Sequence, residues 1–378
     1  MKQETTPGTV ISMSQSDILV QIEDGAQPTW DFERIQSEEV QGTSSRRPGL
    51  TGRRLASMAL SYWLRGSTSL STAAIASQLF ESAMLKRSQV RQVTSGSVTG
   101  GPFENGETIT GGTSAATGRV FRNRSSSPIL YVPITGSFTS GEVITGGTSG
   151  ATATTSSTPS DQGYVYEPKD SDFEGSESKH HVSFKLLQDG FFWEGRGCLS
   201  DLNFEFKNGH PARLRQTISG AYSSHGDQAL YSGVTYPESA VTPPRFSNIS
   251  LTLGAYAPRD IVEMTFSIPT DPQPREDANN ASDAGILYAD YLKAEPTLSF
   301  DPAMVKAATK DYFTELKEAG TFAVTWKLTG TAGNNWDFFA DEAQFIEVGT
   351  GDRRGIALAP LRIGLYGTNN DEFAIWQH

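Results

Sequence analysis

The fold class of this chain is decided by the stretch RRLASMALSYWL, residues 53–64. Its apolar side chains recur at every second position, separated by small or polar residues. A period of two places alternate side chains on one face of a β-strand, so the stretch predicts a strand that buries one face. Gly66 and Ser67 follow and are expected to end it. The alternating apolar positions are Ala56, Met58, Leu60, Tyr62 and Leu64.

Similar strand patterns return in the second half of the chain, separated by hairpin turn signals. Residues 181–186 are followed by Asp189-Gly190, and residues 199–206 alternate and end at Asn208-Gly209. Both dipeptides favour tight turns, and strands joined by tight turns are antiparallel. Further strands are expected at residues 191–195, 213–219, 249–253, 262–268, 297–300, 322–328, 343–348 and 357–366.

Two segments have the spacing of an amphipathic helix. In residues 72–85 apolar side chains lie roughly one helical turn apart. In residues 301–320, Asp301 is expected to cap the helix N-terminus, with Pro302 at the first helical position and Gly320 beyond the end. The sequence therefore predicts a mainly β, antiparallel fold with two short helices.

An internal repeat interrupts this pattern where Gly, Ser and Thr dominate. The copies are FENGETITGGTSAAT, residues 103–117, and FTSGEVITGGTSGAT, residues 138–152, offset by 35 residues. A Gly-Gly pair between β-branched residues suits a tight turn, because both glycines can take positive φ. Each copy is therefore expected to be a small hairpin, and two hairpins can bury a face against each other.

The first 50 residues are expected to form an extended arm rather than a packed element. Residues 18–22 could form a short strand, and the segment from Arg34 to Arg47 is a charged loop. The predicted domains are thus the arm, 1–50, a β-sandwich core, 51–93 and 159–378, and an inserted hairpin repeat domain, 94–158.

The charge of the chain argues against a grip on nucleic acid. Its 378 residues include 31 Lys and Arg against 43 Asp and Glu, a net charge of −12. Affinity for a phosphate backbone comes from cations that displace counterions, so an acidic chain is a poor binder. Such a chain could still line a passage through which nucleic acid slides.

Cysteine content and hydropathy bear on disulfides, metal binding and membrane association. The single cysteine, Cys198, allows no intramolecular disulfide and no Cys-based metal cage, and we expect it to be a buried small apolar residue. The N-terminus lacks the apolar core of a signal peptide, and no run approaches the ~18 apolar residues of a membrane span. A soluble protein made in the cytoplasm, without a membrane anchor, is expected.

No residue pattern predicts catalytic, cofactor-binding or metal-binding residues. The histidines lack zinc-ligand spacing, and we expect the adjacent pair His180-His181 to lie on the surface. The glycine-rich run 146–150 lacks the ending of a phosphate-binding loop. A calcium site is the less favoured reading of an acidic cluster in the loop 270–284, because its order is not that of an EF-hand. The residues weighed are His180, His181, His210, His225, His378, Asp271, Glu276, Asp277 and Asp283.

The stretch from Gly52 to the C-terminus resembles the tail tube proteins, or major tail proteins, of long-tailed bacteriophages. The order of several short segments carries the resemblance, because none of them is diagnostic alone. The repeat is also similar to hairpin modules of various virion proteins. The segments are residues 52–67, YEPKDS (166–171), residues 182–190, EGRGC (194–198), LNFEFKNG (202–209), TISGAY (217–222), GTAGNN (330–335) and IGLYG (363–367).

This resemblance implies a tail tube fold, a β-sandwich or barrel-like subunit whose rings, of six copies, stack into a tube that conducts DNA. The partners implied are other copies of the chain, the tape measure, terminator and baseplate proteins, and DNA passing without sequence-specific contact. The implied location is the virion, assembled in the host cytoplasm. The arm and the repeat domain depart from the family pattern. Loops 34–47 and 270–284 are candidates for ring-to-ring contacts, and the repeat domain is expected to project outwards.

Other readings of the sequence remain open. The chain could be a carbohydrate- or surface-binding β-sandwich, a baseplate component or a tail-completion ring. Its tryptophans could stack on sugars, although packing in a core or interface is the expected role. A hydrolase lacks any supporting motif, and we expect no enzymatic activity. The tryptophans concerned are Trp63, Trp193, Trp326, Trp336 and Trp376.

Overall fold

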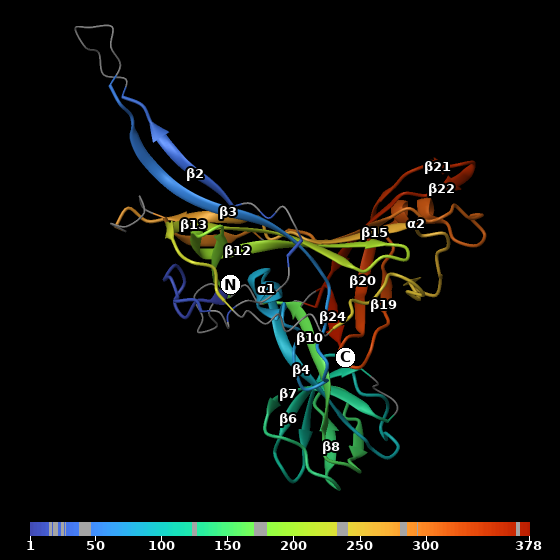
Figure 1. The fold of residues 1–378 in the computed structure, drawn as a ribbon. Coiled ribbons are helices and arrows are strands. Elements are labelled where there is room, and N and C mark those ends of the chain that lie inside the picture. Colours follow the sequence, from blue (N-terminus) through green and yellow to red (C-terminus); the bar gives the residue numbers. More distant parts are fainter. Residues whose placement is uncertain are drawn as a thin grey trace.

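The computed structural model describes an antiparallel β protein with two short helices. In the described residues every strand pairing is antiparallel, which confirms the predicted class. Figure 1 shows a β-rich body from which a long hairpin rises on one side, while a smaller β unit lies on the opposite side. The described residues are 1–14, 17, 22–23, 26, 28–37, 47–122, 127–169, 180–232, 241–279, 286–292, 294–367 and 371–378.

Strand β12 (Phe191–Lys207) is the longest strand and joins the two halves of the body. Along its length it pairs with β13 (Arg213–Asp227), which pairs in turn with β3 (Leu50–Trp63). Beyond β3 lies β2 (Pro28–Ile35). The first half of β12 also pairs with β11 (Val182–Gln188), whose outer edge is joined over two residues by β1 (Lys2–Gln3).

The second half of β12 leads into the other half of the body. It pairs with β15, and the order then runs β15–β18–β23–β20. Strand β20 also joins β19 and β24, which extend to β14 and, through β10, to β4. The bounds are β15 Glu263–Ile268, β18 Thr297–Phe300, β23 Leu361–Tyr366, β20 Trp336–Val348, β19 Phe322–Leu328, β24 Ala374–Gln377, β14 Thr252–Leu253, β10 Ser160–Pro168 and β4 Leu85–Val93.

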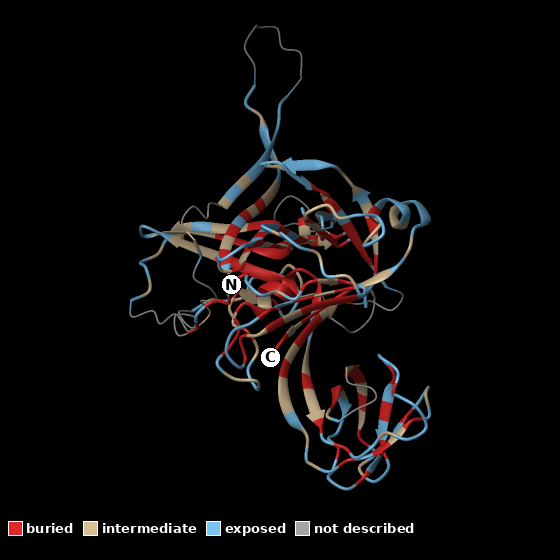
Figure 2. Cartoon of the chain, turned by 90° about the vertical axis from the view of Figure 1, so that its right-hand side faces the viewer, coloured by how far each residue is buried: buried red, intermediate tan, exposed pale blue. Residues whose placement is uncertain are grey.

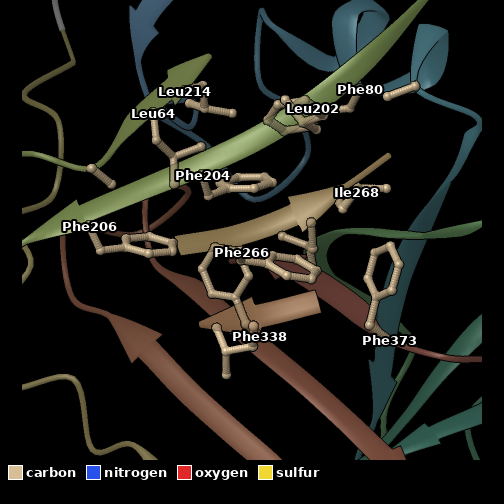
Figure 3. Close-up of a cluster of buried hydrophobic side chains, with 14 of the residues drawn as sticks. Leu64, Phe80, Leu202, Phe204, Phe206, Leu214, Phe266, Ile268, Phe338 and Phe373 are labelled. Atoms are coloured by element: carbon tan, nitrogen blue, oxygen red, sulfur yellow. The ribbon is translucent and has the colours of Figure 1, made fainter. Parts of the chain in front are cut away.

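The core of the body lies between these strands and is rich in aromatic rings. Phe204 is fully buried, and its ring lies 5.6 Å from that of Phe266 and 5.5 Å from that of Phe338. Trp326 stacks on Phe338 at 4.8 Å. Figure 3 shows side chains of β12, β13 and β15 converging on this cluster. The alternation of Leu202, Phe204 and Phe206 with half-buried polar residues predicted this inward face correctly.

The repeat segment forms a small unit with its own apolar core. Its strands are β5 (Thr108–Gly111), β6 (Thr117–Arg122), β7 (Ile129–Thr135), β8 (Val143–Gly146) and β9 (Thr152–Thr154). They bury Phe103, Ile109, Tyr131, Phe138 and Ile144 among others. The hairpins β5–β6 and β8–β9 confirm that each copy of the repeat forms a hairpin. We call residues 94–158 the repeat unit.

Both helices are shorter than predicted. Helix α1 covers only Ser77–Ser82, and the chain then takes positive φ at Met84 and enters β4. Helix α2 covers Tyr312–Glu318. Its N-cap is Asp311, whose carboxylate accepts a hydrogen bond from the amide of Thr314 at 3.0 Å. The predicted cap at Asp301 is wrong, because the next residues pair elsewhere: Ala303 forms a β-bridge with Leu358.

Two segments expected to be loops contain strands. In the arm, β2 is an eight-residue strand of the body sheet, although six of its side chains are exposed. In the segment 270–284, β16 (Pro272–Glu276) pairs with β17 (Ile286–Tyr291). The rest of the second loop, residues 280–284, lies outside the described residues, as do 18–21 and 38–46. A last small hairpin joins β21 (Gly351–Arg353) to β22 (Ile356–Leu358).

We predict that Phe204→Ala lowers the free energy of unfolding by about 3–5 kcal/mol, because it leaves a cavity among rings that cannot collapse into it. Urea denaturation measures the loss. Phe313→Ala is the matched control, since Phe313 is 48% exposed on α2 and should change stability by less than about 0.5 kcal/mol. Equal effects of the two substitutions would contradict this account of the core.

Candidate assembly surfaces

The outer half of the β2–β3 hairpin exposes apolar side chains, although the ring of Phe32 also packs 5.1 Å from that of Tyr222. Phe32 is 45% exposed, Ile35 51% and Leu50 73%. Ile35 and Leu50 are cross-strand partners, so their side chains stand together on one face. Figure 2 shows this part of the hairpin rising beyond the body, mostly exposed. We call Ile35 and Leu50 the hairpin knob.

A cavity of about 270 Å³ lies where the base of this hairpin meets the body. Its walls come from β2, β3 and β13 on one side and from the β16–β17 hairpin on the other. Small and apolar residues predominate among them, and of the described residues that line it Asp31 alone is charged. The lining includes Asp31, Leu55, Ser57, Ser219, Pro274 and Ala289. We call it the hairpin cavity.

The face of β13, β12 and β15 that points away from the core is polar, and its cations are paired. Arg215 lies 2.8 Å from Glu205, and Lys207 lies 3.2 Å from Glu263. Arg213 forms an ion pair with Glu23. These side chains are half-buried or exposed, and each cation has an acid beside it. The surface therefore offers little unpaired positive charge to a polyanion.

The two copies of the repeat hold each other through exchanged carboxylates. Glu142 of the second copy accepts hydrogen bonds from the amides of Thr113 and Ser114, at 3.2 and 3.0 Å, in the turn of the first copy. Glu107 of the first copy accepts from the amides of Thr148 and Ser149, both at 3.0 Å, in the turn of the second. The arrangement has pseudo-two-fold symmetry, and β5 pairs with β8 at its centre.

This exchange explains the Gly-Gly pairs differently from the sequence prediction. Gly111 and Gly146 do not have positive φ, whereas Ala115 and Gly150 do. A Cβ on Gly111 would lie 2.5 Å from a carboxylate oxygen of Glu142, so glycine makes room for the acid of the other copy. The predicted hairpins are correct, but the predicted reason for their glycines is wrong.

Threonines form a row across the exposed face of the repeat unit. Thr152 pairs with Thr145, Thr145 with Thr110, Thr110 with Thr117, and Thr117 with Thr135. The hydroxyls of Thr117 and Thr135 lie 2.8 Å apart. Cross-strand threonine pairs of this kind stabilise a sheet, which accounts for the Thr-rich composition.

The repeat unit is packed against the body. The ring of Phe121 lies 5.4 Å from that of Phe339 and 5.7 Å from that of Trp376. Arg119 forms an ion pair with Glu167, and the amide of Asn105 donates to Asp341 at 3.1 Å. These contacts fix the orientation of the unit relative to β10, β20 and β24.

An acid that the sequence analysis did not single out anchors the N-terminal segment. Glu4 is 3% exposed and accepts hydrogen bonds from the hydroxyl of Ser183 at 2.6 Å and from the amide of Gly197 at 2.7 Å. Burial raises the pKa of Glu4, against the opposing effects of these bonds and of Arg196. In the sequence, nothing distinguishes Glu4 from the other acids of the predicted arm.

The histidines and acids that the sequence analysis considered are dispersed. His181 is fully buried, with its Nε2 2.7 Å from the carbonyl oxygen of Ala289, so the surface prediction for it is wrong. His180 is half-buried, and His210 and His225 are exposed. Glu276 pairs with Arg53, and Asp283 lies outside the described residues. Within the described ranges, no three His, Cys, Asp or Glu side chains are grouped as a metal site requires.

The tryptophans and the cysteine have mainly packing roles. Trp326 and Trp336 are buried in the core, as expected, and Trp193 and Trp376 pack on neighbouring rings. Trp63 is 40% exposed and donates to Glu23. Cys198 is fully buried, which confirms its prediction, and burial raises the pKa of its thiol.

The chain was compared with protein-family models and with curated proteins. No protein-family model matches it, and neither does any curated protein. In the described part of the chain, neither helix has the length and apolar character needed to cross a membrane.

The exchanged carboxylates make the repeat unit sensitive to acid. Although burial would raise the pKa of Glu142, hydrogen bonds from Ser114, Thr139 and Thr113 lower it from 4.5 to about 2. A lowered pKa stabilises the fold above pH 4.5, and this contribution is lost as the pH falls towards 2. We therefore expect the protection factors of the amides in the turn 112–116 to fall through this pH range. Hydrogen–deuterium exchange mass spectrometry measures them once the observed rates are divided into the intrinsic exchange rate at each pH.

Glu142→Gln should weaken both the turn and its pH dependence. We expect a loss of about 1–3 kcal/mol in the local stability of the repeat unit at neutral pH, because charge-assisted hydrogen bonds are replaced by neutral ones. Glu104→Gln, an exposed acid of the same unit, is the control and should match the wild type. An unchanged pH profile in Glu142→Gln would contradict the assignment.

Proposed function

We propose that this chain is a structural protein that assembles with copies of itself into stacked rings, forming the tail tube through which a long-tailed bacteriophage passes its DNA. The observation that carries the proposal is the β2–β3 hairpin, which extends from the body and exposes Phe32, Ile35 and Leu50. Exposed apolar side chains on a projecting element gain stability when another surface covers them. The resemblance of the sequence to tail tube proteins suggests six copies in each ring.

The open edge of the sheet supports the same proposal. Among the described strands, β2 pairs only with β3, so its other edge has unused backbone groups. A strand edge of this kind is a template for pairing with another chain, and closure into a ring satisfies it. A head-to-tail contact between rings repeats without limit and builds a filament.

The charge pattern suits a conduit for DNA. The net charge is −12, and the cations Arg213, Arg215 and Lys207 on the polar face are each paired with an acid. A lumen lined by such a face would neither hold DNA nor require sequence-specific contact. The repeat unit lies on the opposite side of the body from the hairpin, so it can project outwards from a ring that the hairpin helps to build (Figure 1).

Assembly of the purified protein tests the proposal directly. We expect the wild type to form rings or tubes with a central hole in negative-stain electron microscopy, with a matching rise in light scattering. Phe32→Ser/Leu50→Ser should remain monomeric at the same concentration, because the apolar contact is lost. Ile356→Ser is the control, since Ile356 is 50% exposed on another hairpin and should not affect assembly.

A wild type that stays monomeric at all concentrations, even when seeded with tail tips, would argue against the tube and for a binding module. Purified glycans would then be the ligands to test. Assembly that persists in the double variant would instead place the contact away from the hairpin.

Removal of the acids that pair with the cations of the polar face should make this face attract DNA. In Glu205→Gln/Glu263→Gln, Arg215 and Lys207 lose their acids, and two new phosphate contacts become possible. We expect the assembled variant to retain duplex DNA at low salt, with a slope of log K against log salt steeper by roughly 2 than that of the wild type. Glu318→Gln, on α2, is the control, because it removes a negative charge away from the polar face and should leave DNA binding unchanged. If it increased DNA binding as much as the double variant does, the effect would come from net charge and not from the two freed cations.

A further inference from the structure

The hairpin knob is largely exposed to solvent in the part of the chain that the structure describes. Ile35 and Leu50 are 51% and 73% exposed, and their cross-strand pairing joins them into one apolar projection. Arg34 precedes Ile35 on β2 and is also exposed, with its side chain starting from the opposite face of the strand. Within the described ranges, Arg34 forms no ion pair. The projection therefore combines two aliphatic side chains with one unpaired cation.

The hairpin cavity has the complementary character. Its volume of about 270 Å³ exceeds the ~150 Å³ of an apolar cavity that holds a benzene ring, so it has room for two aliphatic side chains. Leu55, Pro274 and Ala289 give it apolar walls, and Asp31 places a carboxylate at the lining. Asp31 is exposed and, in the part of the chain that the structure describes, has no cationic partner.

One chain cannot bring these two surfaces together. Asp31 and Ile35 are four residues apart on the same extended strand, so the knob stands about 13 Å along β2 from the cavity of its own chain. A second copy has no such restriction. Contact between two different patches is heterologous, so one copy can give its knob and receive another at the same time.

We propose that the hairpin cavity is the receptor for the hairpin knob of a second copy, with Ile35 and Leu50 in the cavity and Arg34 paired with Asp31. This inference rests on the proposed self-assembly and adds the two patches that meet. The contact joins apolar burial to one ion pair that is partly removed from water. It sets a fixed direction from copy to copy, because knob and cavity are different surfaces.

Crosslinking between two variants, each with one added cysteine, tests the contact. Leu50→Cys and Ser57→Cys place thiols on the knob and in the cavity, and the native Cys198 is fully buried. Mixed in equal amounts under assembly conditions and treated with a short bismaleimide, they should give a covalent heterodimer. Leu50→Cys mixed with Thr145→Cys, on the repeat unit, is the control and should give none.

Charge reversal supplies a second test that does not depend on thiols. Asp31→Arg and Arg34→Asp should each raise the critical concentration for assembly about tenfold, because like charges then meet. The double variant Asp31→Arg/Arg34→Asp should return to within about threefold of the wild type, since the pair is restored with opposite polarity. Circular dichroism should show all three variants folded, because both residues are exposed.

The outcomes separate this inference from the proposed function. A wild type that never assembles overturns both. Assembly of the wild type without the heterodimer, or with single reversals that have no effect or are not rescued, overturns the knob and cavity alone and leaves the tube proposal in place. The heterodimer together with rescue by the double reversal establishes the contact.

Discussion

The body of this protein depends on the need to satisfy backbone hydrogen bonds along both edges of β12. This strand has 17 residues and pairs with β13 along one edge. On its other edge, β11 pairs with the first half and β15 with the second, so one strand belongs to both halves of the body. Near the point where the partner on that edge changes, the register of β12 with β13 shifts between Arg196 and Leu199, which is a bulge on the opposite edge.

The N-terminal segment supplies hydrogen-bond partners at the bulge in β12. Glu4 accepts a hydrogen bond from the amide of Gly197, and Arg196 donates to the carbonyl oxygens of Gly8 and Leu287. A buried amide without a partner costs about 1–3 kcal/mol, so the bond from Gly197 to Glu4 stabilises the bulge inside the protein. The bonds from Arg196 hold the N-terminal segment and β17 against it. The sheet is curved here, since Trp30 on β2 stacks on Phe184 on β11 at 6.2 Å.

Patterns in the sequence predicted correctly the features that depend only on residues close to one another in the chain. The alternation at Leu202, Phe204 and Phe206 identified an inward face because a strand of any topology has a period of two. The cap signals at Asp301 and Pro302 failed because Ala303 bridges to Leu358, a contact that no local pattern contains. His181 is buried for the same kind of reason, since its partner is the carbonyl group of Ala289, 108 residues away.

The repeat also shows that contacts between distant residues cannot be read from a sequence pattern. Its period of 35 residues was visible, and each copy is the expected hairpin. That Glu107 and Glu142 serve the opposite copy could not be read from the sequence, because an exchanged bond and a bond within one copy need the same residues. The candidate surfaces were less predictable still. The hairpin cavity combines β2, β3 and β13 with a hairpin that begins 45 residues after β13 ends, and only the folded chain brings these together.

The exposed knob is easier to understand in an assembly than in a monomer. Two aliphatic side chains held in water on a projecting hairpin contribute nothing to the stability of one chain, whose core is already filled by Phe204 and its neighbours. A single knob would also give a weak contact, because the area that two side chains bury is small against the entropy lost on association. In a ring every copy makes such a contact at once, and the open edge of β2 adds backbone hydrogen bonds, so weak contacts act together. Weak single contacts would also keep isolated chains apart until many can form, as the proposed assembly into a tube requires.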